Sequence, residues 1–423
     1  MEKIQNNYTS PRWSIEITDC SMPMSLDTYS KCSYNCLYCF SYFQKSHNVE
    51  GYLNGPARSV NVDKIKKLFT NAMSDNRAGS GKTDQQFFAY IKDRRIMQWG
   101  GMADQFDENE KRNGVTLELL RFFDAIDYPL SFSTKSTWWT EDGRYMDLFS
   151  KHTHNWHVKV SIITLNHKLS KIVEKGVPSP SERLQAIKRL SDIGIHVTLR
   201  LRPYIIGISE DYPLTISEAW KAGADSMTVE YFCMESRADA RLIARYKEIG
   251  KAAGYDVFSF YRKNSKQAGY KRLNRSIKYP VISHMREISK SLGMRFNVSD
   301  AFCRELNDST NCCGVPPEWG VSQECNINKA ILIAREKGCV SFCDIKKGIN
   351  DYFDFDWSYA AGYNTSSNFQ RALKYDMSMA QFLRQNWNNI KSGNSPGKGY
   401  GGILSPQGID DNGDVVYKYM GRC

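Results

Sequence analysis

The sequence predicts an α/β protein whose core is a partial (β/α)6 barrel of the TIM type. Strand-like apolar runs alternate with segments of helical period from about Met24 to Glu235, and six strand–helix units follow one another there. Glycine or polar residues stand where several of these strands end. Strands that alternate with helices favour a parallel sheet, and six units predict an open barrel with its chemistry on the loops after the strands.

The predicted elements follow in chain order. A strand at 24–28 leads into a cysteine-rich loop, and a helix at 60–74 is capped by Asn61 or Asp63. The later elements are a strand at 96–99, a helix at 116–127, strands at 130–136 and 158–164, a helix that ends at Asp192, a strand at 197–203, a helix at 214–222 and a strand at 226–231. Ser179, Pro180 and Glu182 predict a capped start for the helix that ends at Asp192.

The loop after the first strand contains three cysteines, Cys32, Cys36 and Cys39, at C-x3-C-x2-C spacing, with Tyr38 just before the third. Three thiolates so close in sequence can surround one small metal centre and leave a coordination position open. A closed structural zinc site needs four ligands, whereas thiolates of this kind also suit iron–sulfur clusters. The spacing therefore favours a [4Fe–4S] cluster with one open iron.

With this motif the sequence resembles the radical S-adenosylmethionine (radical SAM) family, whose signature is C-x3-C-x-aromatic-C. The resemblance implies that Cys32, Cys36 and Cys39 are the cluster ligands and catalytic residues, and that Tyr38 packs near the adenine of S-adenosylmethionine. It also implies reductive cleavage of that cofactor to a 5′-deoxyadenosyl radical, with electrons from a donor such as flavodoxin or ferredoxin. Pro178–Leu184, Arg200–Pro203 and Ser133–Ser136 resemble the spore photoproduct lyase-like branch.

Further cofactor-binding residues are predicted at the ends of the strands. Gly100 and Gly101 allow a ligand to approach the backbone closely. The family has Gly-Gly-Glu at this point and Met102 replaces the acid here, so the contacts expected are those of the backbone. Lys135 is either a partner of the cofactor carboxylate or a surface lysine, Ser161 is expected to donate to the cofactor, and the resemblance makes Arg183 a cofactor-facing residue.

Six cysteines lie together near the C-terminal end, Cys303, Cys312, Cys313, Cys325, Cys339 and Cys343. A second metal site is expected from Cys303, one of Cys312 and Cys313 (Cys313 is preferred), Cys339 and Cys343, with Cys325 as a substitute. It would hold either a second iron–sulfur cluster or zinc. Alternatively, one free cysteine donates a hydrogen atom to a substrate radical, as the resemblance permits. His152, His154 and His157 are also spaced as zinc ligands, but no neighbouring carboxylate or cysteine completes them in sequence, so an exposed loop is expected.

The 423 residues carry a formal net charge of +11, and nearly all of that excess lies between Arg237 and Lys290. Basic and aromatic residues alternate in this segment, a composition that suits a phosphate backbone and unstacked bases, although a solvated helical surface would have the same composition. The apolar runs are too short to span a membrane, and the polar N-terminus does not resemble a signal peptide, so a cytoplasmic protein is expected. Twelve cysteines then indicate metal or redox chemistry.

These observations divide the chain into residues 1–235, the barrel with an N-terminal lead; 236–300, the basic segment; and 301–423, a cysteine-rich, mainly helical extension. They predict a radical SAM enzyme that abstracts hydrogen from a nucleic acid or a nucleobase-derived molecule. One alternative is a peptide- or protein-modifying radical SAM enzyme with an auxiliary cluster. Another is a non-catalytic iron–sulfur sensor that binds nucleic acid.

Overall fold

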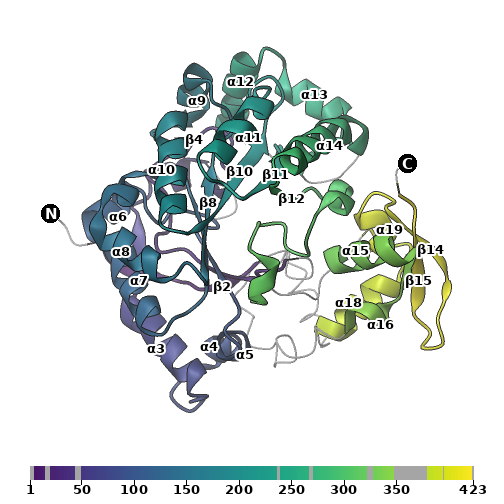
Figure 1. Ribbon diagram of the computed structural model, residues 1–423, viewed down its shortest axis with the longest axis horizontal. Helices are drawn as coiled ribbons and strands as arrows, with labels where there is room; N and C mark the ends of the chain where they lie inside the picture. The colour runs from purple at the N-terminus through teal and green to yellow at the C-terminus, as the bar shows by residue number, and fades with distance from the viewer. Residues whose placement is uncertain are drawn as a thin grey trace.

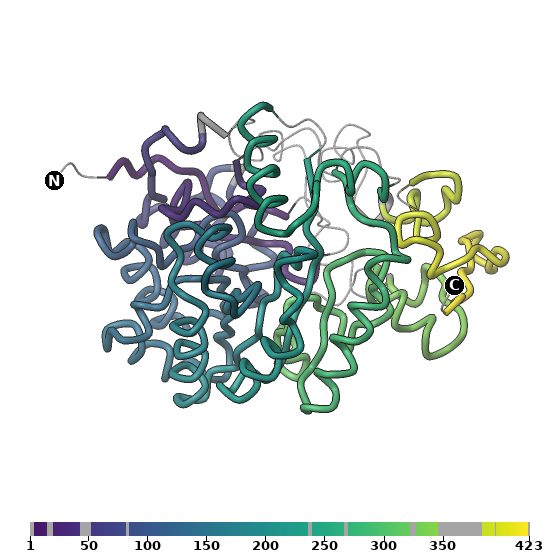
Figure 2. The backbone as a smooth tube through the Cα atoms, turned by 90° about the horizontal axis from the view of Figure 1, so that it is seen from above, coloured from purple at the N-terminus to yellow at the C-terminus, as the bar shows by residue number. Residues whose placement is uncertain are grey.

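A computed structural model describes residues 4–14, 20–42, 49–235, 239–265, 270–321, 327–346, 379–393 and 395–421. The chain progresses across the molecule, with its N-terminal half on one side and its C-terminal residues on the other (Figure 2). Within the described residues, no helix is both long and apolar enough to cross a membrane.

The centre of the protein is an eight-stranded sheet in the order β12-β11-β10-β8-β7-β6-β3-β2. The seven strands from β3 to β12 run parallel, and the short edge strand β2 is antiparallel to β3. The bounds are β2 Arg12–Trp13, β3 Met24–Leu26, β6 Met97–Trp99, β7 Leu130–Thr134, β8 Trp156–Ser161, β10 His196–Tyr204, β11 Ser226–Tyr231 and β12 Arg295–Val298. The predicted large parallel sheet is confirmed, whereas its partial-barrel curvature stays a prediction.

Helices lie around the outside of these strands (Figure 1). In the first half of the chain they are α2 Val49–Asn54, α3 Val62–Met73, α4 Lys82–Gln85, α5 Phe88–Lys92, α6 Glu108–Asn113, α7 Val115–Ala125, α8 Gly143–Lys151, α9 His167–Val173 and α10 Pro180–Asp192. Later in the chain they are α11 Tyr212–Lys221, α12 Ala240–Ala253, α13 Val257–Lys263 and α14 Arg275–Ser291. Asn61 caps α3, and Ser179 with Glu182 forms the predicted capping box of α10. Glu182 is therefore used in a helix cap.

All six predicted strands are present, but the sheet does not stop at residue 235. β12 adds a further parallel strand beside β11, with Met227 opposite Phe296 and Val229 opposite Val298. Helix α14 packs against β11 and β12, so the predicted basic segment contributes to the main sheet layer. The four-residue β12 follows α14, and its short apolar run gave no separate strand signal in the sequence.

The C-terminal part is a smaller unit that combines several helices with a small sheet. It contains α15 Ile327–Lys337, α16 Phe342–Lys346, α18 Met379–Asn388 and α19 Pro396–Gly399. A three-stranded antiparallel sheet accompanies them, in the order β13 Cys339–Val340, β15 Val415–Tyr419, β14 Leu404–Ile409. The alternating Val415, Tyr417 and Tyr419 turn inward against this unit, which is the period of a half-buried strand. Among the described residues of the predicted helical extension, helix predominates over strand, and the small sheet is an addition that the sequence did not predict.

The two faces of the large sheet differ in chemistry. Side chains alternate along a strand, and one set joins the hydrophobic core with the surrounding helices: Phe132, Val158, Val160, Leu199, Leu201, Met227 and Val229. The alternate set is polar and includes Ser131, Ser133, His157, Lys159, Ser161, Thr198, Arg200, Arg202, Thr228 and Glu230. We call this second set the polar face. A buried polar face requires partners for its side chains.

Candidate functional site

The three motif cysteines lie on a loop that follows the C-terminal end of β3, and a second strand pair holds this loop in place. Cys36 belongs to β4 (Asn35–Cys36), which pairs antiparallel with β9 (Glu174–Lys175) and has Glu174 opposite Cys36. The backbone N–H of Leu37 also donates to the carbonyl of Val173 over 2.8 Å. The loop is thus attached to the connection between β8 and α10.

Arg245, from α12, fixes the loop on its other side. Its guanidinium donates to the carbonyl of Cys36 over 2.6 Å and to the carbonyl of Leu37 over 3.3 Å. It also donates to the hydroxyl of Tyr42 and lies over that ring at 4.3 Å. Backbone carbonyls that face a fixed cation cannot reorient without losing charge-assisted hydrogen bonds. Sequence analysis missed this role because Arg245 lies more than two hundred residues away, in a segment assigned to nucleic acid.

Tyr38 begins a buried polar chain that connects the loop to α10. Its hydroxyl donates to Glu174, and Glu174 pairs with Arg183 over 2.6 Å, with both side chains fully buried. Arg183 also donates to the carbonyl of Ser161 over 2.7 Å and to the hydroxyl of Ser170 over 3.0 Å. The Arg183 guanidinium therefore orients Glu174 and the end of β8, so it acts in this structure as a positioning residue.

Lys135 lies on the same side of the sheet. Its ammonium is 5.7 Å from the centre of the Tyr38 ring, within the range of a cation–π interaction. Burial raises the pKa of the Cys36 thiol to about 12, and Lys135 and Arg183 are close enough to lower it in part. The side chain of Lys135 therefore lies at the cysteine loop, and it is not remote from the predicted site.

Asp104 connects the loop to the strand end that carries Lys135. Its backbone N–H lies 2.8 Å from the sulfur of Cys32. Its carboxylate accepts from the backbone N–H of Lys135 over 2.6 Å and from the hydroxyl of Thr134 over 2.9 Å. Burial, together with the carboxylates of Asp107 and Asp104, raises the pKa of Cys32. One sulfur of the motif therefore already faces a backbone donor of the kind that surrounds iron–sulfur clusters.

Gly100 and Gly101 lie at the end of β6, beside this loop. Gly100 has φ = 87°, and a Cβ there would lie 2.6 Å from the carbonyl of Ser133, so only glycine fits. The carboxylate of Asp27 accepts from the backbone N–H of Met102 over 2.8 Å and from that of Ala103 over 3.2 Å. Asp27 thus fixes the Gly-Gly turn from β3, a contact that the sequence alone did not indicate.

The three thiols suit a cluster better than a single ion. All three are free of disulfides. In the described part of the chain they are not among the groups that bring three ligand atoms within 4.8 Å of one another, so their spacing is wider than the shell of one ion. Three thiols on one loop beside a glycine turn are a donor set that fits an iron–sulfur cluster. Of the predicted residues, Tyr38 lies within this loop and Lys135 contacts it at the Tyr38 ring. Arg183 is linked to the loop through Glu174, and Ser161 through Arg183.

The C-terminal cysteines are distributed differently. Cys303 is fully buried in a 3-10 turn, Ala301–Leu306, and Cys313 is buried beside Ile96, whereas Cys339 and Cys343 are exposed on the C-terminal unit. Among the described residues, no group with three ligand atoms within 4.8 Å contains Cys303, Cys313 or Cys339. Cys325 lies outside the described residues. The auxiliary site therefore stays a prediction.

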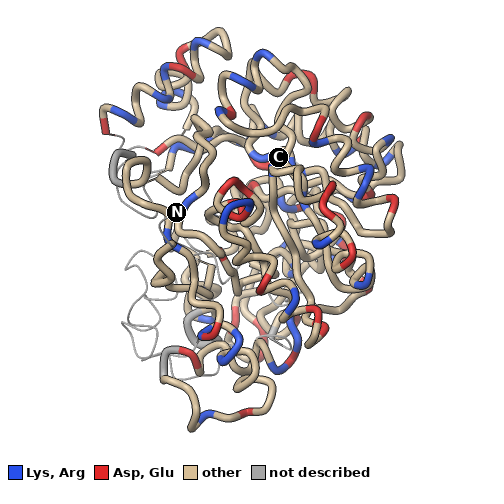
Figure 3. Tube along the Cα trace, turned by 90° about the vertical axis from the view of Figure 1, so that its left-hand side faces the viewer, with Lys and Arg blue, Asp and Glu red and all other residues tan. Residues whose placement is uncertain are grey.

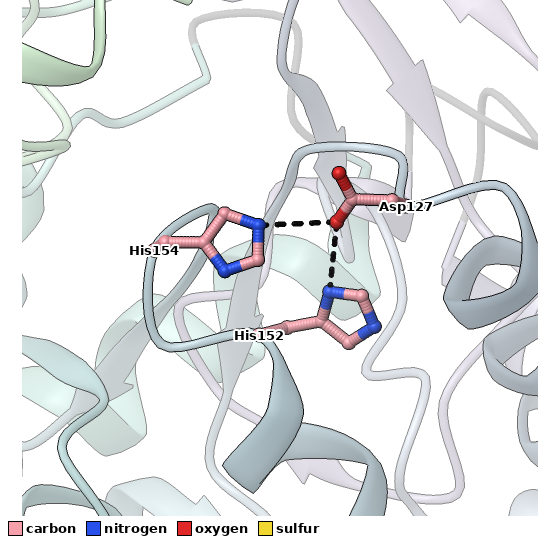
Figure 4. Close-up of side chains that lie close together, drawn as sticks. All are labelled: Asp127, His152 and His154. Carbon is pink, nitrogen blue, oxygen red and sulfur yellow. Dashed lines mark hydrogen bonds and ion pairs between the residues drawn. The ribbon is translucent and has the colours of Figure 1, made fainter.

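The histidine-rich turn has the carboxylate partner that the sequence did not reveal. Both His152 and His154 point toward Asp127, and nitrogens of the two rings lie 3.3 Å and 3.1 Å from the same Asp127 oxygen (Figure 4). The expectation that no carboxylate accompanies them is wrong, because Asp127 ends the preceding helical segment. The other His152 nitrogen lies 2.9 Å from Asp124, and Arg94 also contacts Asp127. Both ring nitrogens of His152 thus face oxygen atoms of the protein, and Asp127 is shared between two histidines and Arg94.

Many cations of the basic segment are used within the fold. Lys278 pairs with Asp300 over 2.5 Å with both buried, and Arg286 and Lys290 both contact Asp308. Along the described Cα trace in Figure 3, basic and acidic residues are interspersed. The net charge of residues 237–290 taken alone is therefore misleading, because the acidic partners of these three cations lie beyond residue 290.

Comparisons with known proteins give distant similarities. No family model matches the chain. Uncharacterized proteins of Mycobacterium tuberculosis and Mycobacterium bovis are 24% identical to it over 248 residues, which are 55% of this chain and 68% of each of those proteins.

Among solved structures, a mutant of spore photoproduct lyase aligns with 15% identity and a TM-score of 0.48, over 70% of this chain and 80% of that one. Another mutant of that lyase, with bound AdoMet and dinucleoside spore photoproduct, has 17% identity and a TM-score of 0.47, over 68% and 80%. Streptococcus suis SuiB bound to precursor peptide SuiA has 12% identity and a TM-score of 0.42, over 68% and 51%. The chain is thus similar to spore photoproduct lyase and to SuiB.

Proposed function

We propose that this protein is a radical SAM enzyme. The observation that supports the proposal best is the position of the C-x3-C-x2-C loop. It lies directly after β3, at the C-terminal edge of a parallel sheet, where ligands of such sheets bind. The Gly-Gly turn after β6, Lys135 after β7 and Ser161 at the end of β8 belong to the neighbouring strands.

Cys32, Cys36 and Cys39 would hold the [4Fe–4S] cluster, and the remaining iron would bind S-adenosylmethionine. When bound, this pair supplies an electron-driven cleavage that yields a 5′-deoxyadenosyl radical able to abstract hydrogen from a substrate. The protein binds, orients and shields the reactants. Tyr38 lies within the loop and Lys135 lies beside it. Of the Gly-Gly turn, the backbone of Gly101 would contact the cofactor, since the N–H of Gly100 already donates to the carbonyl of Leu26.

Glu174 and Arg183 position rather than react. The pair is fully buried and holds Tyr38 at one end and the carbonyl of Ser161 at the other. Glu174 accepts a hydrogen bond from Tyr38 of the loop, and Arg183 donates one to the carbonyl of Ser161 at the end of β8. A change in either residue would therefore move the loop relative to that strand end. An electron donor such as flavodoxin or ferredoxin would complete the system.

For the substrate we propose a nucleic acid or a nucleobase-derived molecule, with peptide modification as the alternative. The chain offers the basic residues of 237–290 for the first class, although internal ion pairs use several of them. Of the similar structures, one is spore photoproduct lyase with bound dinucleoside spore photoproduct and another is SuiB bound to a precursor peptide. A second cluster or zinc at Cys303, Cys313, Cys339 and Cys343 belongs to the peptide alternative.

One assay tests the enzyme proposal against a non-catalytic sensor. Anaerobically reconstituted, reduced protein should release 5′-deoxyadenosine from S-adenosylmethionine. Cys36→Ala should abolish the release, and Cys20→Ala, outside every proposed ligand set, should retain it. Protein that binds about four iron atoms but releases no 5′-deoxyadenosine would contradict the proposal and support the sensor.

A further inference from the structure

The polar face of the large sheet carries three cations on adjacent strands. Lys159 lies on β8, and Arg200 and Arg202 lie on β10. The register places Thr198 opposite Lys159 and Arg200 opposite Ser161, with Thr228 of β11 on the other side of Arg200. Parallel strands lie about 4.8 Å apart, so the three side chains extend from one small area of the sheet.

Two of these cations have no carboxylate partner within the described part of the chain. Lys159 is 1% exposed and donates only to the hydroxyl of Ser131, over 3.0 Å. Arg200 makes one long hydrogen bond, 3.4 Å, to the hydroxyl of Ser161. Arg202 pairs with Glu230, so the group retains an excess of two positive charges. Uncompensated buried charge costs several kcal/mol, and such a group indicates an anion.

The electrostatics of these side chains agree with that count. Burial, with the repulsion of Arg202 next in size, lowers the pKa of Arg200 to about 10. Burial also lowers the pKa of Lys159 to about 8, against the opposing effect of the Cys313 thiol. Arg202 thus disfavours the charged forms of both Arg200 and Lys159, and at Arg200 the carboxylate of Glu230 opposes this effect.

The area around the cations remains accessible. Arg202 and Glu230 keep 22% and 27% of their side-chain surface although they lie on central strands. The Nε of Arg202 and the hydroxyl of Ser133 are buried without a hydrogen-bond partner. Unpaired donors beside exposed charged groups are what an unliganded oxyanion site would present.

The site is bounded at both ends. Toward the starts of the strands, the segment of residues 311–315 lies on the polar face, where Thr228 donates to the carbonyl of Cys312 over 2.6 Å. Gly314 approaches so closely that a Cβ would lie 2.3 Å from the hydroxyl of Thr198. Toward the strand ends lies the cysteine loop, and Tyr38 is near enough to influence Arg200. A ligand held by the cations would therefore face the loop.

We propose that Lys159, Arg200 and Arg202 form a binding site for an oxyanion, a phosphate or carboxylate group carried by the substrate. The assignment of that group to the substrate rests on the proposed function, whereas the anion site itself does not. Two arginines offer planar forks that bind such groups bidentately, and the lysine adds a point charge. The substrate's anionic end is thus bound on the sheet, and its reacting part lies toward Cys32–Cys39.

Isothermal titration calorimetry tests this site on the full-length reconstituted protein, saturated with S-adenosylmethionine and kept unreduced. Pyrophosphate and citrate are the probes, and the tighter one identifies phosphate or carboxylate as the preferred group. We expect saturable binding that Arg200→Gln and Lys159→Gln each weaken by about tenfold or more. Lys188→Gln, a matched change at an exposed ion pair on α10, should leave binding unchanged.

Circular dichroism checks the folding of each variant. If Arg200→Gln fails to fold, Arg200→Lys replaces it, because it keeps the charge. Arg200→Lys should lose only the part of the affinity that comes from bidentate binding. The proposal is overturned if neither probe binds saturably. It is also overturned if Arg200→Gln and Lys159→Gln bind the probes as tightly as the wild type does. Binding that S-adenosylmethionine abolishes overturns it as well, because the anion would then occupy the cofactor's own position. Release of 5′-deoxyadenosine by the wild type tests the proposed function separately. Its result does not depend on whether the anion probes bind.

Discussion

The protein has two groups of cysteines, and the structure treats them differently. Cys32, Cys36 and Cys39 lie on one short loop that β9, Arg245 and Asp104 hold from three directions. The described C-terminal cysteines Cys303, Cys313, Cys339 and Cys343 lie on separate segments and range from fully buried to exposed. The difference shows that ligands close in sequence need only a fixed loop, whereas dispersed ligands need the whole fold to bring them together. The predictions below test this contrast.

The largest effect is expected for the cluster motif. Cys36→Ala should remove nearly all bound iron and reduce 5′-deoxyadenosine release to background, because three local thiolates cannot be replaced from elsewhere. Iron analysis and chromatography of the products measure both. Cys343→Ala is the matched control from the other group and should retain both; the contrast fails if the two variants lose iron equally.

The next effect concerns the buried pair beneath the loop. Glu174→Ala leaves Arg183 charged and unpaired in the interior, so it should lower the free energy of unfolding by about 3–5 kcal/mol. Urea denaturation of the metal-free protein measures this. Lys175→Ala, next in sequence and in an exposed pair with Glu248, should change it by less than about 1 kcal/mol.

A double change separates structure from function at this pair. Glu174→Leu with Arg183→Met replaces both charges by apolar groups and should recover much of the lost stability. Affinity for S-adenosylmethionine should remain low, since Tyr38 has lost its partner and the loop its orientation. Recovery of both properties would show that the pair serves stability alone.

A smaller effect is expected for the arginine that caps the loop. Arg245→Met removes charge-assisted hydrogen bonds to loop carbonyls and should lower the free energy of unfolding by about 1.5–3 kcal/mol. It should also lower the iron content after reconstitution. Arg262→Met is the control, because Arg262 is an exposed cation of the same segment and lies over the Phe258 ring. Equal iron loading in the two variants would contradict the positioning role of Arg245.

The smallest effects are expected in the C-terminal group. Because Cys339 and Cys343 are exposed and Cys303 is buried elsewhere, we expect about four iron atoms per chain in the wild type. Cys339→Ala should change neither the iron content nor, beyond about 0.5 kcal/mol, the stability. About eight iron atoms, reduced to four in Cys339→Ala, would instead establish the auxiliary cluster that the sequence predicts.

The sequence determined much of the fold because its signals are local. The periodicity of apolar residues predicted the six strands and the helix at Val62–Met73, and Ser179 with Glu182 predicted the start of α10. Strand β12 and the C-terminal sheet were missed, since short strands paired across long distances leave little local pattern. Spacing identified the cysteine motif, and the position at a strand end indicated Gly100 and Gly101.

Only the tertiary structure decided which charges meet. It placed Arg245 on the cysteine loop, paired Glu174 with Arg183, and brought Asp127 to the histidine turn. Among the described residues it also gave Lys159 and Arg200 hydroxyl partners and no ion pair, while acids from beyond residue 290 neutralised part of the basic segment. The burial and the ion pairs of a charged side chain depend on neighbours that are remote in sequence. The cysteine spacing could therefore indicate a thiolate loop, whereas the proposed oxyanion site could not be inferred from the sequence.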